Sequence, residues 1–195
     1  AADVRILALA AGLPVTAEVS PHHLAFTEDR LRSYDTQFKM APPLRSAEDV
    51  EAVRKALASG LIDLIATDHA PHSVHDKDTE FTEAANGILG LQTAVSSTLQ
   101  LVHQGVLSLG RWIDSLSRAP AQLLGIPHGT LALGSAADLT LIDGHRVWTL
   151  GAQDILSKSV NTPFIGMQFK GKVISTIVGG RIVYDEEGRA CTKNT

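Results

Sequence analysis

The sequence predicts an α/β fold with parallel strands, followed by a region of short antiparallel strands. Apolar runs at residues 15–19 and 61–66 each end in polar residues and each precede a helical pattern, which is typical of parallel α/β sheets. After Pro127 the helical patterns give way to short β-type runs. An eight-stranded α/β barrel takes about 250 residues, so a barrel containing these two strands would lie mostly outside the chain.

The composition is that of an ordinary globular protein. Its 195 residues are 44% hydrophobic and 19% charged, and no apolar run approaches the roughly 18 residues of a membrane span. The formal net charge of −4 is unlike the basic surplus of proteins that bind nucleic acid. Cys191, the single cysteine, excludes an internal disulfide or a cysteine-based zinc cluster. We therefore expect a cytoplasmic protein whose partners include neither nucleic acid nor a membrane.

The start of the chain indicates a fragment. Residues 3–13 have the apolar spacing of a helix, but no capping residue precedes them. The chain also opens without an initiator methionine and without the basic and apolar segments of a signal peptide.

The predicted helices have identifiable ends. Ser46 resembles the first residue of a capping box, and the helix that it opens should end at Gly60. Apolar spacing over residues 91–101 predicts a second helix that ends at Gly105. Ser108 is the expected N-cap of a third helix.

The runs after Pro127 predict strands at 129–133, 138–142, 173–178 and 181–184. The last two form a hairpin, because Gly179 and Gly180 suit the positive φ values of a two-residue turn. The chain therefore divides into residues 1–126, with the parallel strands, and residues 127–195, with the antiparallel ones.

Titratable side chains gather at the ends of the two parallel strands. Five of the eight histidines lie in this part of the chain: His22, His23, His69, His72 and His75. Asp68 follows the second strand, where a poorly solvated carboxylate needs a cation or a proton. A bound metal is one interpretation, and a carboxylate that caps the following turn is the other.

The histidines leave several interpretations open. His72 is either a surface turn residue or a donor that faces an anionic substrate, and His69 fits both roles. Adjacent residues at a strand end point to opposite sides, so at most one of His22 and His23 can face a common site. We favour a structural role for that pair, and a solvated loop position for His75.

Two loops could contact a ligand. Ala41 precedes Pro42 and Pro43 in a stiff segment before a helix, which could present backbone N–H groups to an anion or serve only as a rigid connection. Asn86 and Gly87 lie in an expected loop, where the glycine would let backbone amides approach a ligand closely. These patterns indicate a hydrolytic or lyase-like metal site of which some parts are missing.

Three segments, taken in order, resemble dihydroorotases of the bacterial long-chain class, within the amidohydrolase superfamily. They are VTAEVSPHHL at 15–24, FKMAPPLR at 38–45 and IATDHAPH at 65–72. The resemblance implies a TIM-type (β/α)8 barrel with a small β-sandwich. Residues 1–126 would supply the last two barrel strands and their helices, and residues 127–195 the C-terminal share of the sandwich. Most metal ligands would then precede Ala1.

The resemblance also implies roles for particular residues. Asp68 matches the last-strand aspartate that binds the more buried of two zinc ions and shuttles a proton to and from the attacking water. His72 matches the residue that contacts the substrate carboxylate, and Asn86 and Gly87 match the loop that holds the dihydropyrimidine ring of the substrate. Ala41 stands at a substrate-binding position where the family often has asparagine, so it offers no side-chain hydrogen bond. The resemblance does not extend to His23 as a zinc ligand.

The implied reaction is the reversible, zinc-dependent cyclisation of N-carbamoyl-L-aspartate to L-dihydroorotate in pyrimidine synthesis. The implied partners are that small substrate, the missing N-terminal half of the barrel, and a second subunit or aspartate transcarbamoylase. Two alternatives stay open. One is an allantoinase or hydantoinase, whose substrates lack the ring carboxylate, and the other is a catalytically inactive scaffold subunit for aspartate transcarbamoylase.

Overall fold

The computed structural model describes residues 10–188. Most of the helix predicted at 3–13, and Cys191, lie outside the described residues. The helices are α2 (Pro21–Ala25), α3 (Ala47–Ser59), α4 (Val74–Lys77), α5 (Ala94–His103), α6 (Leu109–Ile113) and α7 (Ala119–Leu124). Short helical turns are η1 (Glu28–Ser33), η2 (Thr36–Phe38), η3 (Asp114–Arg118) and η4 (Ala152–Asp154).

The first sheet consists of β1 (Glu18–Val19) and β2 (Leu64–Ile65), which pair in parallel as predicted. Both strands are shorter than the apolar runs that predicted them. Just before the paired residues, the Asp63 N–H donates to the Ala17 carbonyl at 2.9 Å, but the Ala17 N–H donates to the side-chain Oδ2 of Asp63 at 2.8 Å rather than to a backbone carbonyl. Regular pairing therefore begins only at Glu18.

The predicted helix caps are confirmed. The Ser46 side chain accepts the Asp49 N–H at the start of α3, and Gly60 ends that helix with φ of +81°. The Ser108 side chain accepts the Arg111 N–H and opens α6, which continues through the π-helical turn η3 into α7. The helix predicted from Leu91 begins only at Ala94.

The second sheet contains β3 (Leu139–Thr149), β4 (Gln168–Val178) and β5 (Arg181–Asp185) in antiparallel order. The hairpin turn at Gly179 and Gly180 is confirmed, with φ of +55° and +78°. Both β3 and β4 are longer than predicted. In β3, Asp143 interrupts the apolar pattern at an irregularity in the pairing with β4, and the strand continues beyond it.

The strand predicted at 129–133 is wrong. This segment forms no strand, and Leu131 and Leu133 are 84% and 105% exposed. A strand needs a hydrogen-bonded neighbour, and within residues 10–188 none pairs with this segment.

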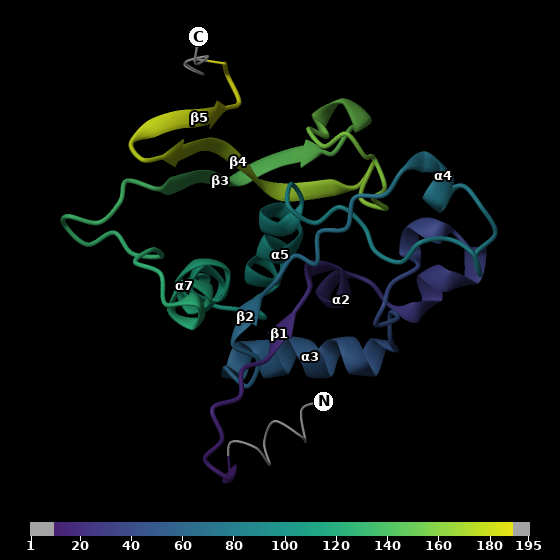
Figure 1. Cartoon of the computed structure of the whole chain (residues 1–195), viewed down its shortest axis with the longest axis horizontal. Coiled ribbons are helices and arrows are strands. Elements are labelled where there is room, and N and C mark those ends of the chain that lie inside the picture. The colour runs from purple at the N-terminus through teal and green to yellow at the C-terminus, as the bar shows by residue number, and fades with distance from the viewer. Residues whose placement is uncertain (1–9, 189–195) are drawn as a thin grey trace.

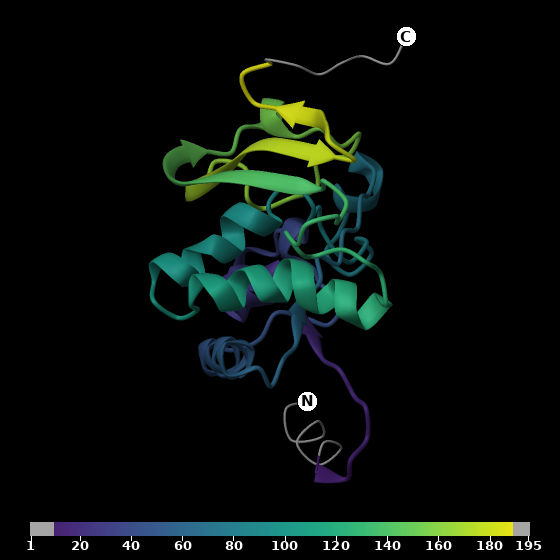
Figure 2. The same cartoon turned by 90° about the vertical axis from the view of Figure 1, so that its left-hand side faces the viewer.

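The elements stack in layers. The three-stranded sheet covers α5, the run of α6 and α7 lies beside α5, and α3 lies on the far side of the β1–β2 pair (Figures 1 and 2). One apolar core joins Val19 and Ile65 to Leu57, Leu99 and Trp112. None of the described helices is both long and apolar enough to cross a membrane.

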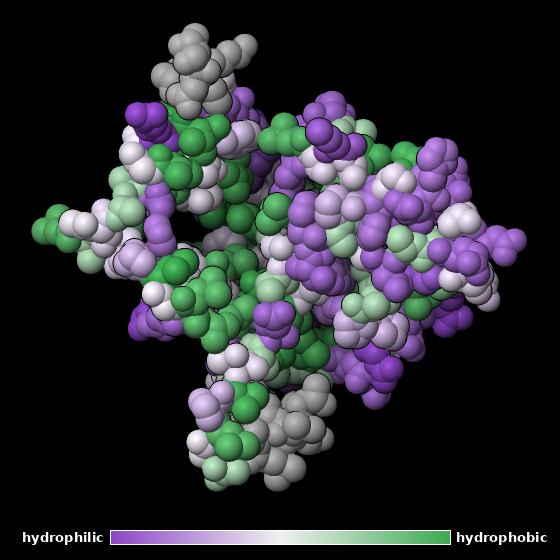
Figure 3. Space-filling model, viewed as in Figure 1, coloured by the Kyte–Doolittle hydropathy of each residue, from purple (hydrophilic) through white to green (hydrophobic). Residues whose placement is uncertain are grey.

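A second core lies beneath the loops that follow the strands. It includes Phe26, Phe38, Ile88, Phe164 and Phe169, so it joins the segment after β1 to the segment before β4. The face in Figure 3 has apolar residues on the side of β1, β2 and α7, and polar residues on the side of α4. The second core therefore supports a polar rim of loops.

Candidate functional site at the ends of the parallel strands

His22 and Asp68 meet at the ends of β1 and β2. His22 lies in the first turn of α2, directly after β1, and Asp68 follows β2. His22 Nε2 lies 3.9 Å from Asp68 Oδ2. The parallel pairing of Val19 with Ile65 places both side chains at the same edge of the sheet.

His22 is buried, and its Nε2 has no hydrogen-bond partner in the described part of the chain. Burial, together with a smaller effect of the neighbouring His23, lowers the pKa of His22 to about 3. The ring is therefore neutral at pH 7. A buried polar nitrogen without a partner is unfavourable, and a neutral imidazole nitrogen is a common metal ligand.

His23 has a different environment. Its Nδ1 lies 2.6 Å from Ser20 Oγ, and its Nε2 lies 3.0 Å from the Pro42 carbonyl oxygen. Because a carbonyl only accepts, Nε2 carries the proton and Nδ1 accepts from the serine hydroxyl. His23 therefore ties α2 to the proline segment, which agrees with the structural role expected for it.

Our expectation for the pair needs a correction at His22. The two histidines do not continue the strand but lie in α2, with ring centroids 4.6 Å apart. The helix turns His22 toward Asp68 and His23 toward Pro42. Sequence reasoning assumed strand geometry here and so did not place His22 beside Asp68, although Pro21 after Ser20 is a usual start of a helix.

Asp68 has a left-handed backbone with φ of +50°, which aspartate tolerates better than most residues. Its side chain is 55% exposed. Within residues 10–188 its carboxylate accepts no hydrogen bond from the turn that follows, so the capping interpretation is wrong. The carboxylate is left facing His22 and the solvent.

His69 and His72 both bind the loop that precedes α5. His69 Nδ1 accepts the N–H groups of Gly90 and Leu91, at 3.0 and 3.4 Å. His72 Nε2 lies 2.8 Å from the Asn86 carbonyl oxygen, so it carries a proton and donates. Nδ1 is then the ring nitrogen of His72 that remains for a ligand.

The loop of Asn86 and Gly87 is held tightly. Asn86 is exposed, whereas Gly87 is buried, with φ of +99° and a position at which a Cβ would lie 2.7 Å from Ala70 Cβ. The Gly87 N–H donates to the Lys39 carbonyl at 2.9 Å. Glycine is therefore required here for close packing, and its own amide is occupied within the protein.

The other predicted residues lie on the rim. Ala41 is exposed beside Pro42, whose carbonyl His23 binds. His75 is exposed in α4, a short helix rather than the loop that we expected. Neither residue contributes to the pair of His22 and Asp68.

Within residues 10–188 no three histidine, cysteine or acidic side chains group together to hold a metal. His22 and Asp68 provide one nitrogen and one oxygen donor. This donor set suits zinc, and the unpartnered Nε2 of His22 is an atom that a metal would satisfy. A zinc ion held by these two donors would need further ligands from outside the described residues.

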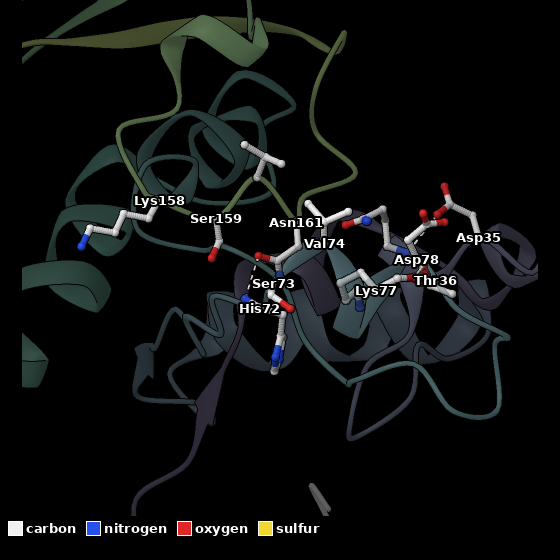
Figure 4. Close-up of a pocket in the computed structure, with 12 residues that line it drawn as sticks. Asp35, Thr36, His72, Ser73, Val74, Lys77, Asp78, Lys158, Ser159 and Asn161 are labelled. Atoms are coloured by element: carbon white, nitrogen blue, oxygen red, sulfur yellow. Dashed lines mark hydrogen bonds between the residues drawn. The ribbon is translucent and has the colours of Figure 1, made fainter.

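A cavity of about 410 Å³ is lined by His72 and the segment that follows it (Figure 4). Asp35, Lys77, Lys158 and Asn161 are among the residues that line it. Neither His22 nor Asp68 reaches this cavity.

Comparison with known proteins gives a consistent family. The model of the amidohydrolase family matches residues 2–183. The chain is 52% identical over 177 residues to the dihydroorotase of Geobacter metallireducens, covering 91% of this chain and 42% of that protein. It is 54% identical over 181 residues to the dihydroorotase of Anaeromyxobacter dehalogenans strain 2CP-C, covering 92% of this chain and 42% of that protein.

Solved structures show the same fold. The L-hydantoinase of Arthrobacter aurescens matches with a TM-score of 0.87 and 34% identity, over 94% of this chain and 42% of that one. The dihydropyrimidinase of Brevibacillus agri matches with a TM-score of 0.85 and 27% identity, over 94% of this chain and 42% of that one. The chain thus spans about two fifths of the length of the proteins it matches.

Proposed function

The chain belongs to the amidohydrolase family, and on that premise we propose that the complete protein is a zinc-dependent dihydroorotase. It would interconvert N-carbamoyl-L-aspartate and L-dihydroorotate, with loss of water in the direction of ring closure. The observation that carries the proposal is the identity of 52% and 54% with dihydroorotases over nine tenths of the chain. Identity with the L-hydantoinase is 34%.

The contacts at the strand ends support the roles that we propose for His22 and Asp68. His22 Nε2 and an Asp68 oxygen would hold the zinc, together with ligands from the rest of the protein. Zinc bound there would supply the Lewis acidity that polarises the ring amide. Asp68 accepts the proton of the attacking water and returns it to the leaving ring nitrogen.

The substrate would lie between Asp68 and the loop before α5. His72 donates from Nδ1, when that nitrogen is protonated, to the carboxylate of the substrate, since Nε2 is bound to Asn86. Asn86 and Gly87 shape the edge of the ring site, and Ala41 borders it without a polar group. The exposed Asn86 supports this role, because it is the member of the loop that a ligand can reach.

The family also supports a proposal for the architecture. Residues 1–126 would form the C-terminal part of a (β/α)8 barrel and residues 127–195 the C-terminal share of a β-sandwich. The remaining barrel strands would pack beside the β1–β2 pair, and Leu13 and Val15, which precede β1, are 54% and 39% exposed. A second subunit or aspartate transcarbamoylase is a further candidate partner.

The test is to purify the complete protein with zinc and compare its turnover of dihydroorotate, hydantoin and allantoin. The proposal expects the highest kcat/KM for dihydroorotate. Preference for hydantoin or allantoin would assign the site to another cyclic amide. Zinc-loaded protein inert on all three would support the scaffold alternative.

A further inference from the structure

Lys77 is a buried cation whose ammonium group forms no ion pair within residues 10–188. It lies at the end of α4 and is 3% exposed. Its Nζ donates to the carbonyl oxygens of Ala85 and Gly87, at 2.8 and 3.2 Å. Burial and, to a smaller extent, nearby Lys39 lower the pKa of Lys77 to about 8, against an opposing effect of Asp35. Burying an ammonium group costs free energy. The two hydrogen bonds of Lys77 therefore point to a functional role for the loop that it binds.

Asn161 binds the same loop from the opposite part of the chain. It lies between β3 and β4 and is 3% exposed. Its Oδ1 accepts the His72 N–H at 3.0 Å, as Figure 4 shows. Its Nδ2 donates to the carbonyls of Ala70 and Gly87, at 2.8 and 3.4 Å. One side chain thus links the segment that carries His72 to the loop that carries Gly87.

The two side chains converge on one atom. The Gly87 carbonyl oxygen receives hydrogen bonds from both Lys77 and Asn161. The adjacent Asn86 carbonyl receives the Nε2–H of His72. The position of this loop and the orientation of the His72 ring therefore depend on each other.

We propose that Lys77 and Asn161 are positioning residues that hold the 85–87 loop against His72 and thereby set the affinity for the substrate. This inference rests on the proposed function, because it assigns His72 and the loop to the substrate. Neither residue needs to touch the substrate or the metal. Both act through the Gly87 carbonyl and the main chain of residues 70–72.

The expected signature is a split between KM and kcat. Lys77→Met removes the hydrogen bonds to the Ala85 and Gly87 carbonyls while keeping an unbranched side chain. Asn161→Asp keeps the acceptor for the His72 N–H but removes the donor to Gly87. Loss of a charge-assisted or buried hydrogen bond costs enough to change KM about tenfold. In the complete protein, each variant should raise KM for dihydroorotate about tenfold, with kcat within about threefold of wild type.

Arg111 provides a matched control. It is also a partly buried cation that binds main-chain carbonyls, those of Leu57, Ile62 and Asp63, but these lie in the connection from α3 to β2. Arg111→Met should lower Tm and leave KM unchanged. If Arg111→Met raised KM as much as Lys77→Met, the change in KM would reflect a general loss of stability, and the proposal would be overturned.

Hydrogen exchange measures how well the amides of the loop are protected, independently of catalytic activity. In the complete protein without substrate, amides of residues 85–89 should exchange faster in Lys77→Met and Asn161→Asp than in wild type or Arg111→Met. Unchanged exchange in a folded variant overturns the proposal, and either folded variant is sufficient to decide it. If wild-type protein does not turn over dihydroorotate, the proposed function fails, whereas the exchange result still decides the positioning role.

Discussion

His22 Nε2 faces Asp68 Oδ2 at 3.9 Å, across the ends of two paired parallel strands. This distance exceeds that of a hydrogen bond, so neither atom satisfies the other. The histidine is buried and neutral, while the carboxylate is half exposed to solvent. A neutral imidazole nitrogen and a carboxylate oxygen are both donors that zinc accepts, and we propose that this pair holds part of a zinc site.

Asp68→Asn should reduce kcat by several orders of magnitude in the complete protein. A carboxamide cannot accept the proton, and a general base contributes roughly 10²–10⁴-fold. Asparagine tolerates the φ of +50° at this position, so the fold should be retained. Steady-state kinetics with circular dichroism as a control for folding tests this, and activity near that of wild type would place the base elsewhere.

His22→Ala should lower the zinc content of the purified complete protein. The matched control is His23→Ala, since the ring nitrogens of His23 face Ser20 and Pro42 rather than Asp68. The control should lose stability, by about 1 kcal/mol for each lost hydrogen bond, and keep its zinc. Metal analysis of both variants after dialysis measures the difference. Equal zinc content in the two variants would contradict the assignment of His22.

His72→Ala should chiefly raise KM for dihydroorotate. A hydrogen bond to a charged group contributes about 1.5–3 kcal/mol, so the loss should reach tenfold or more. A neutral ring substrate without the carboxylate should be affected less, through the lost bond to Asn86 alone. Equal losses on both substrates would mean that His72 only supports the loop.

Lys77 should make stability depend on pH in a specific direction. Its pKa is about 8 in the folded state and 10.5 without burial, so between these values the unfolded chain binds more protons. The free energy of unfolding of wild type, relative to Lys77→Met, should therefore rise with pH across this window. The slope is at most about 1.4 kcal/mol per pH unit. Urea unfolding of both proteins at pH 8 and pH 10 measures it, and a constant difference would contradict burial of the charge.

Residues 1–195 alone, supplied with zinc, should not hydrolyse dihydroorotate. His22 and Asp68 are two donors, whereas a catalytic zinc site has three protein ligands or more. The assay compares the purified chain with a blank that contains zinc only. Turnover above that blank would show that the chain holds a complete site.

Much of the local structure was determined by the sequence. Ser46, Gly60 and Ser108 define helix ends through bonds within one turn, and Gly179 with Gly180 defines a hairpin, so each was predicted correctly. The parallel relation of the two apolar runs also follows from the helices between them. Such features depend on neighbours in the chain, and their signals can be seen without the fold.

The tertiary structure alone decided the length of the strands and the role of each histidine. Residues 129–133 have the pattern of a strand but find no neighbour to pair with. His22 and His23 are adjacent and chemically identical, yet one is buried toward Asp68 and the other binds Pro42. Asn161 and Lys77, which we propose as positioning residues, gave no signal in the sequence, because their shared partner at Gly87 comes close only when distant segments pack. Hydrogen bonds between distant segments depend on how those segments pack, so local sequence patterns do not predict them.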